Sequence, residues 1–314
     1  MATTYSCSIP ARIGLLGNPS DGYFGKCISL PVWNWKATVN LSKTSESNTF
    51  TLPENDGLRR IMEPTIRVFQ NHFRTELIPF NATVETNIPR QVGLAGSSAI
   101  ETAFMLALMA LHDISVNAIS RRELAEMILK IETEELQIVA GLQDRLPQTY
   151  GCMLFMDFDE NLMTERGYGD YYELQSSNLP SLWLAHAPMG KDSGETHSGL
   201  TRRWEEKEQQ MVSIIEQLAN CAIEGKNAIE QKMVEELASC IDTNFDLRCE
   251  LFTKESLGDT WEAVMLARSL GSCAKQTGSG GAIFGIIPND DFPQIADIEF
   301  TAMGWQFHSN LEVS

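Results

Sequence analysis

A glycine- and serine-rich stretch, 89–98 (PRQVGLAGSS), has the residue types of a polyphosphate-binding loop. It lies between an alternating segment, 82–87, and an apolar run, 99–111, so the pattern predicts a strand, a tight loop and a helix. Ser97 and Ser98 are both favourable N-cap residues, and we expect the helix to begin at one of them. The first N–H groups of a helix lack partners and lie at the positive end of its dipole, which suits an anion. The candidate phosphate contacts are Gly93, Leu94, Ala95, Gly96, Ser97 and Ser98.

A tight turn alone would also explain these glycines, so the prediction depends on other parts of the chain. A second glycine-rich stretch, 277–281 (TGSGG), leads into an apolar strand and offers Gly278, Ser279 and Gly280 as further nucleotide contacts. Mg²⁺ prefers carboxylates together with phosphate oxygens and water. The serine hydroxyl that we expect to reach Mg²⁺ is that of Ser98, in preference to Ser97. The carboxylates on offer are those of the helical segment that precedes Asp144, namely Glu132, Glu134 and Glu135.

The composition excludes several classes of partner. The chain has 314 residues, and 42 acidic against 24 basic residues give a net charge of −18. Nucleic acids and anionic membranes bind through Lys and Arg, so neither is an expected partner. The N-terminus has no leader pattern, and the longest apolar run is too short to cross a bilayer, so we expect a soluble, cytoplasmic protein. The seven cysteines and five histidines have no metal-binding spacing, which predicts reduced thiols and no transition-metal site.

Hydrophobic periodicity predicts a mixed chain of strands and helices. The expected strands are 8–17, 27–33, 36–41, 82–87, 151–158, 182–187, 282–287 and 305–313. The expected helices are 58–77, which Pro64 should start or kink, 99–111, 121–139, 200–238 with an interruption near Gly225, and 260–270. The polar segment 160–180 is rich in Gly, Tyr and Ser and predicts a seam between two domains.

Three stretches, PARIGLLGNPSD (10–21), PRQVGLAGSSA (89–99) and TGSGGAIF (277–284), follow one another in a fixed order. They resemble the three motifs of the GHMP kinase superfamily, and the resemblance covers nearly the whole chain. The stretches GLLGNPSDGYFGKCISL, IPRQVGLAGSSAI, IVAGLQDRLPQTYG, NFDLR and AKQTGSGGA are similar, more closely, to plant-type glucuronokinases, which phosphorylate D-glucuronate at its anomeric hydroxyl. The resemblance implies an ATP-dependent, Mg²⁺-assisted kinase.

The resemblance also implies an α+β fold of two domains, with ATP and substrate in the cleft between them. The N-terminal, ATP-binding domain is expected to span residues 1–170 with a ribosomal-S5-like topology. The C-terminal domain is expected to span residues 171–314 with a ferredoxin-like topology.

Four side chains receive roles from the resemblance. Asp144 takes the position of the catalytic Asp, which accepts the proton of the attacking hydroxyl. Arg12 takes the position of an Arg that pairs with this Asp and contacts the phosphate. Glu132 corresponds to the Mg²⁺-binding Glu, with Glu134 as the alternative. Asp21 aligns with an Asp that binds sugar hydroxyls in galactokinase.

The chain departs from galactokinase just before Asp21. The Glu-His of galactokinase is replaced by Asn18-Pro19, which removes a carboxylate from the substrate pocket. The loss is expected if the substrate carries its own carboxylate, because two carboxylates in contact repel each other. A uronate then requires a cation, and Arg248, which follows the glucuronokinase-like 244–247, is our preferred candidate, because a guanidinium holds a carboxylate by two parallel hydrogen bonds. The other cations considered are Lys26, Arg145, Lys191, Arg202 and Lys275.

Two other interpretations stay open at this point. One is a GHMP kinase for another substrate, such as galacturonate, a different sugar or mevalonate. The other is a sensor that kept the fold and lost the reaction, although Arg12, Ser98, Glu132 and Asp144 are all present.

Overall fold

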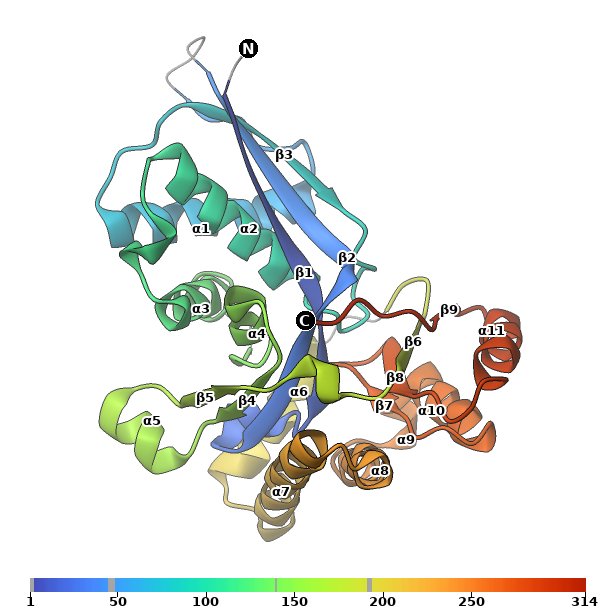
Figure 1. The fold of residues 1–314 in the computed structure, drawn as a ribbon. Coiled ribbons are helices and arrows are strands. Elements are labelled where there is room, and N and C mark those ends of the chain that lie inside the picture. Colours follow the sequence, from blue (N-terminus) through green and yellow to red (C-terminus); the bar gives the residue numbers. More distant parts are fainter. Residues whose placement is uncertain (1–2, 45–48, 139, 191–193) are drawn as a thin grey trace.

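Two antiparallel sheets organise the chain in the computed structural model, which describes residues 3–44, 49–138, 140–190 and 194–314 (Figure 1). The first sheet has its longest strand, β2 (Lys26–Lys43), in the centre, with β1 (Thr4–Leu16) along one edge. On the other edge, the first part of β2 pairs with β4 (Leu154–Asp157) and the last part pairs with β3 (Phe80–Thr86). β5 (Asp170–Glu173) extends the sheet beyond β4. The second sheet has the order β7 (Lys275–Gln276), β8 (Ala282–Ile286), β6 (Leu182–His186) and β9 (Gln306–His308).

β2 is one strand where the sequence predicts two. Its residues 27–32 are buried on both faces, whereas from Trp35 onwards buried and more exposed residues alternate. The register against β1 shifts where Pro10 pairs with Lys36 and Ala11 pairs with Val32, so a bulge separates the two parts. The change of hydrophobic pattern therefore marks a bulge and not the end of a strand.

Helices cover one face of the first sheet (Figure 1). α1 (Asp56–Phe73) packs on α2 (Gly96–Leu111), which lies against β1 and β2. α3 (Arg121–Lys130) and α4 (Arg145–Tyr150) follow alongside. Pro64 lies inside α1, eight residues after its first residue, so the prediction that Pro64 starts the helix is wrong. The cap is Asn55, whose side chain accepts a hydrogen bond from the Leu58 N–H.

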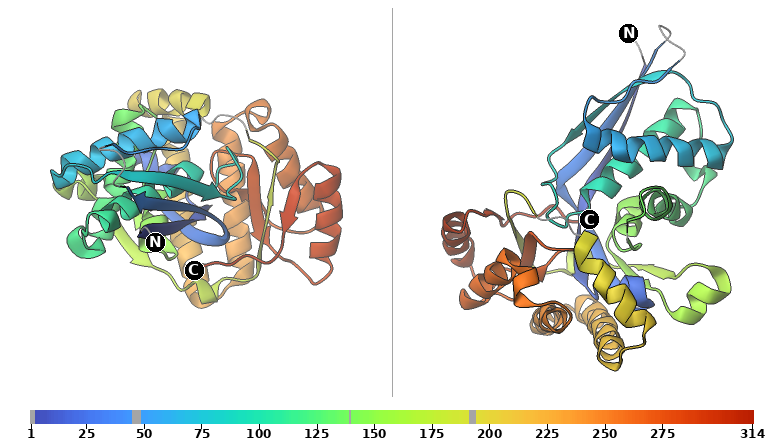
Figure 2. Two further views of the ribbon diagram at one scale, coloured as in Figure 1. Left: turned by 90° about the horizontal axis from the view of Figure 1, so that it is seen from above. Right: turned by 180° about the vertical axis from the view of Figure 1, so that it is seen from behind.

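The predicted long helix 200–238 is three helices, α6 (Gly194–Glu205), α7 (Gln209–Gln231) and α8 (Val234–Leu251). The predicted interruption near Gly225 is wrong, because Gly225 lies inside α7 and packs against Leu16, where a side chain would collide. α7 lies against β2, and α8 contacts both β1 and β7, so these helices join the two sheets from below. α9 (Lys254–Leu257), α10 (Asp259–Ser269) and α11 (Phe292–Ala302) lie with the second sheet to one side of the molecule (Figures 1 and 2).

The polar segment 160–180 contains a helix, α5 (Glu160–Arg166), and the strand β5 of the first sheet. The chain therefore passes from the first sheet to the second between Glu173 and Leu182, and the predicted division at residue 170 stays a prediction. The predicted last strand is shorter than expected, since β9 covers 306–308 and Val313 forms an isolated bridge with Val32.

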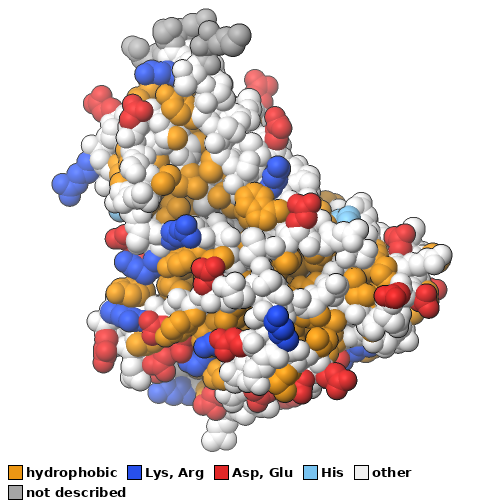
Figure 3. Space-filling model, viewed as in Figure 1, with side chains coloured by type: hydrophobic (Ala, Val, Ile, Leu, Met, Phe, Trp, Pro, Cys, Tyr) orange, Lys and Arg blue, Asp and Glu red, His pale blue; other side chains and the backbone are white. Residues whose placement is uncertain are grey.

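Charged side chains of both signs are scattered over the face of the molecule in Figure 3, and Lys and Arg do not gather there in one patch. Among the helices described, none is both long and apolar enough to traverse a bilayer.

Candidate active site

Arg12 brings three distant parts of the chain together. This residue of β1 is 3 % exposed, and its Nε donates to Oδ1 of Asp144 at 2.8 Å. Its Nη2 contacts the same carboxylate oxygen. Its Nη1 donates to the carbonyl oxygens of Gly93 at 3.0 Å and Thr277 at 2.8 Å. One guanidinium thus connects both glycine-rich loops to the carboxylate of Asp144.

The two glycine-rich loops also pack directly on each other. The Thr277 hydroxyl donates to the Gly93 carbonyl at 2.9 Å. A Cβ at Gly278 would lie 2.6 Å from that carbonyl oxygen, and a Cβ at Gly93, whose φ is +75°, would lie 3.0 Å from the Ser279 nitrogen. Gly93 and Gly278 are therefore required for the contact between the loops, independently of any ligand.

The N-terminal end of α2, where the sequence predicts phosphate binding, differs from the prediction in its cap. The helix begins at Gly96 after Ala95, which is in the left-handed conformation, and no side chain caps it. The expected caps point elsewhere, since the Ser97 hydroxyl donates to Glu132 Oε1 at 2.9 Å and the buried Ser98 hydroxyl donates to Gln148 Oε1 at 2.7 Å. The first N–H groups of α2 consequently receive no side-chain cap and are available to an anion.

Gly96→Val is expected to weaken nucleotide binding without unfolding the protein. The nearest atom to a Cβ at Gly96 is Ile88 Cγ2, at an ordinary contact distance of 3.4 Å, so the fold has room for the side chain. A valine there would exclude phosphate from the helix end. Each charge-assisted hydrogen bond contributes about 1.5–3 kcal/mol, so losing one weakens affinity by roughly tenfold or more. Calorimetry with ATP measures this, and unchanged affinity would remove this loop from the nucleotide site.

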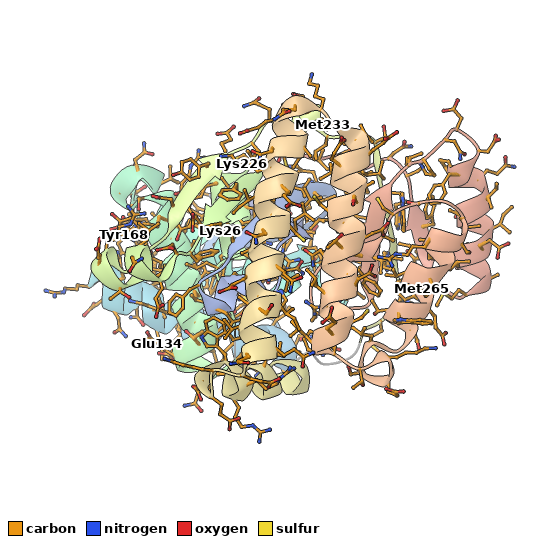
Figure 4. All side chains as sticks on the ribbon, turned by 90° about the horizontal axis from the view of Figure 1, so that it is seen from below. Lys26, Glu134, Tyr168, Lys226, Met233 and Met265 are labelled. Carbon is orange, nitrogen blue, oxygen red and sulfur yellow. The ribbon has the colours of Figure 1, made fainter. Side chains whose placement is uncertain are left out.

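Acidic side chains lie close to Ser97, in the first turn of α2. Glu132 is 6 % exposed and lies in a π-helical turn, 131–135, that follows α3 in place of the predicted continuous helix to residue 139. Its carboxylate contacts Ser97 and the Nη2 of Arg145. The alternative, Glu134, is exposed and lies at the edge of the molecule in the view from below (Figure 4).

This cluster fits a hard cation. Glu101, one helical turn after Ser97, is fully buried beside Glu132, and neither of its carboxyl oxygens accepts a hydrogen bond from a described N–H or hydroxyl donor. Burial, together with the neighbouring Glu132 charge, raises the pKa of Glu101 well above its usual range. No three His, Cys, Asp or Glu side chains in the described part of the chain form a ready metal site, so Mg²⁺ would complete its ligands with phosphate oxygens and water.

Asp21 lies close enough to Asp144 to interact electrostatically with it. It receives a hydrogen bond from the Gln143 N–H, and its carboxyl oxygens occupy the space that a side chain at Gly141 would need. Burial raises the pKa of Asp21 to about 7, and the negative charge of Asp144 adds to the rise. The carboxyl group of Asp21 therefore titrates near neutral pH.

Asp21→Asn should stabilise the protein increasingly as the pH rises. The pKa of Asp21 rises from 3.8 to about 7 on folding, so between these values the folded state holds a proton that the unfolded chain has released. Wild-type stability then falls with pH in this window, whereas the Asn variant lacks this fall. The difference in free energy of unfolding should grow by up to about 4 kcal/mol between pH 4 and 7. Urea unfolding at several pH values measures it, with the exposed Asp56→Asn as control, and a pH-independent difference would contradict this environment for Asp21.

Arg248 lies in α8 close enough to Asp21 to interact electrostatically with it. The side chain is 1 % exposed, its guanidinium lies 4.7 Å from the centre of the Phe252 ring, and it has no hydrogen bond or ion pair among the described residues. Burial lowers its pKa to about 10, which still leaves it protonated at neutral pH.

Each of the other cations considered is already hydrogen-bonded or paired, is exposed, or lies outside the described residues. Lys26 pairs with Asp157 beside α7 and is visible from below (Figure 4), and Arg145 pairs with Glu132. Lys275 is fully buried and donates to three neutral oxygens. Arg202 is exposed, and Lys191 lies outside the described residues. Arg248 is therefore the candidate cation that the structure leaves buried and unpaired within the described chain.

Sequence reasoning missed three side chains of this site. Gln148 holds Ser98 and also donates to the carbonyls of Pro10 and Ala95, and Glu101 and Gln143 contribute buried oxygens that accept no hydrogen bond from a described N–H or hydroxyl donor. Isolated Gln and Glu residues carry no motif, so only the contacts reveal them. A surface hollow of about 510 Å³, lined by Trp204, Lys207 and residues of α7, shares no residue with the site, and we do not assign it to the reaction.

Comparisons with known proteins agree on one family for this chain. Residues 60–152 match the family model of the GHMP kinases N terminal domain. The chain is 36 % identical to glucuronokinase 1 of Arabidopsis thaliana over 88 % of its own length and 83 % of that protein's. Its fold is similar to the Lin0012 protein of Listeria innocua (TM-score 0.81, 16 % identity, covering 99 % and 98 % of the two chains) and to a mevalonate kinase (TM-score 0.74, 16 % identity, covering 96 % and 97 %). The two-sheet α+β fold is that of the GHMP kinases, and the chain belongs to the GHMP kinase superfamily, close to the glucuronokinases.

Proposed function

We propose that the protein transfers the γ-phosphoryl group of ATP to the anomeric hydroxyl of D-glucuronate, giving glucuronate 1-phosphate and ADP. The observation that carries this choice of substrate is Arg248, a buried guanidinium with no hydrogen bond or ion pair to the described residues. An unpaired buried charge is costly, so such a group is expected where a ligand supplies the opposite charge. A uronate carboxylate provides two oxygens in the geometry of the guanidinium fork. The similarity to glucuronokinase 1 supports the same substrate.

The nucleotide phosphates are assigned to the uncapped end of α2 and the facing loop 278–280. Phosphoryl transfer requires mainly positioning and neutralisation of charge, and backbone N–H groups supply both. Mg²⁺, when bound, would neutralise charge on the phosphate oxygens. Glu132 and a serine hydroxyl would hold it. Both Ser97 and Ser98 are candidates, because the Ser97 hydroxyl already donates a hydrogen bond to Glu132, whereas the Ser98 hydroxyl donates to Gln148.

Asp144 accepts the proton of the anomeric hydroxyl as that oxygen attacks the phosphorus. Arg12 orients the carboxylate by donating two hydrogen bonds to one of its oxygens. The second oxygen, Oδ2, lies 3.7 Å from Nη1 of Arg145, a looser contact that leaves it able to take a proton. Asp21 contributes a carboxyl group for the sugar hydroxyls.

A substrate panel tests the proposal. The protein is incubated with Mg-ATP and, separately, with glucuronate, galacturonate, glucose, galactose, a heptose phosphate and mevalonate, and ADP release is measured. We expect glucuronate to give the highest kcat/KM and the neutral hexoses to react poorly. Equal turnover of glucose or galactose and their uronic acids would contradict the role of a carboxylate. No turnover of any substrate by a protein that binds ATP would favour a sensor.

A further inference from the structure

Lys275, the first residue of β7, has a fully buried amine that is enclosed by neutral oxygens. Its Nζ donates to the carbonyl oxygen of Gly14 at 2.9 Å and to Oδ1 of Asn18 at 2.7 Å. A third bond runs to the carbonyl oxygen of Gln276 at 3.0 Å. The ring of Phe284, which pairs with Lys275 across β7 and β8, has its centre 5.3 Å from Nζ. Three oxygens and an aromatic ring thus form a cage for one positive charge.

The number of acceptors in this cage matches the protonated form of the amine. An ammonium group has three N–H bonds, whereas a neutral amine has two and would direct its lone pair at one of the oxygens. Burial and the positive charge of Arg248 lower the pKa of Lys275 well below its usual range, and the three acceptors act in the opposite direction. Because all three acceptors are uncharged, the cage holds the ammonium by coordination and not by ion pairing.

The cage lies where two segments remote in sequence meet. The end of β1 and the turn after it contribute Gly14 and Asn18, and Lys275 leads into the second glycine-rich loop. The Gly14 N–H donates to the Thr277 carbonyl oxygen at 2.9 Å, and a Cβ at Gly14 would lie 2.5 Å from that oxygen, so the two backbones touch directly. Arg12 donates to the same Thr277 oxygen at 2.8 Å. Two buried cations, Arg12 and Lys275, therefore hold this contact together.

Oxygen atoms that converge on one point repel one another unless a cation lies between them. Carbonyl and amide oxygens are also the ligands with which proteins bind monovalent cations such as K⁺. We propose that the ammonium of Lys275 is a tethered substitute for a bound monovalent cation and makes Lys275 a positioning residue. It fixes the turn after β1 against the loop 278–280, to which we assign the nucleotide phosphates. The proposal rests on phosphoryl transfer from ATP and not on the identity of the sugar.

Lys275→Ala, assayed with Mg-ATP and the best substrate of the panel, is expected to lower kcat by about a hundredfold. A displacement of about 1 Å between reacting groups can cost that factor. The affinity for ATP, measured by calorimetry, should change less than kcat, because the end of α2 is untouched. The variant keeps the oxygen cage and leaves space where the amine and its methylene chain were. Ethylammonium, which is small enough for this space, should restore kcat by about tenfold or more.

Tetramethylammonium carries the same charge but no N–H group, so it is the matched salt control and should not restore activity at the same concentration. The wild type should respond to neither salt. Lys275→Met fills the space of the lysine side chain and should have a low kcat that ethylammonium does not restore. Lys36→Ala, which removes an exposed lysine of β2, should keep the wild-type values.

Thermal unfolding gives a second readout that needs no activity. Ethylammonium should raise the unfolding temperature of Lys275→Ala more than that of the wild type, and tetramethylammonium should not. Wild-type kcat in either Lys275 variant, equal effects of the two salts, or a Lys275→Ala protein that ethylammonium neither activates nor stabilises would overturn the proposal. A variant that ethylammonium stabilises, in a protein whose wild type phosphorylates no sugar of the panel, would support the cation cage and contradict the proposed function instead.

Discussion

Asp144→Asn lowers kcat by roughly 10²–10⁴-fold while the protein keeps its fold and its affinity for ATP. Asn retains the oxygen that accepts from Arg12, so the contact between the guanidinium and the loops persists. The amide cannot take a proton from the attacking hydroxyl, and that function is lost. A loose transition state would place the loss at the lower end of this range, because the nucleophile then needs less help from a base.

Steady-state kinetics and calorimetry with ATP measure the two quantities separately. Asp297→Asn, an exposed residue of α11, is a matched control with the same chemical change and should behave as wild type. A fully active Asp144→Asn variant would remove this residue from the mechanism. Loss of ATP affinity together with kcat would assign Asp144 to nucleotide binding instead.

Arg248→Ala is expected to lower kcat/KM for glucuronate by about ten- to a hundredfold and to leave the KM for ATP nearly unchanged. A charge-assisted hydrogen bond in a buried site contributes about 1.5–3 kcal/mol, and each 1.4 kcal/mol corresponds to tenfold. The fold should tolerate the change, because Arg248 forms no ion pair in the described chain and its burial is itself costly. Arg248→Lys should restore little, since an ammonium lacks the planar fork.

Arg202→Ala removes an exposed arginine and is the matched control. If Arg248→Ala alone has no effect while uronates remain preferred, the carboxylate is bound by another cation. Lys26 and Arg145 are already paired with carboxylates, which would direct the search first to Lys191.

The sequence was informative where the chemistry lies in contiguous motifs. Glycine-rich loops next to apolar strands predicted the two loops that meet at Arg12, and alternation predicted most strands. Helix ends were harder to locate. The chain leaves α6 and α7 at Lys207 and Lys232, both in the left-handed conformation that glycine favours, whereas the glycine at 225 serves packing inside α7. Glycine, the usual sequence signal for a helix end, is therefore absent at the ends of α6 and α7 and present inside α7.

The details of the site depend on contacts that sequence spacing does not encode. Ser97 and Ser98 have the residue type of a helix cap, yet both hydroxyls are used by Glu132 and Gln148 from other elements. The sequence of 131–135 predicts a regular α-helix, but these residues form a π turn. The extra residue in the turn changes the direction of the side chains, so that Glu132 is buried and Glu134 is exposed.

The most direct test of the central claim is the identification of the product. Wild-type protein is incubated with Mg-ATP and ¹³C-labelled glucuronate, and the reaction is followed by ³¹P and ¹³C NMR. Our account predicts one new sugar phosphate whose phosphorus couples to the anomeric carbon, formed in step with ADP. Phosphate on any other oxygen of the sugar, or turnover of a neutral sugar or mevalonate with no reaction of glucuronate, would contradict it.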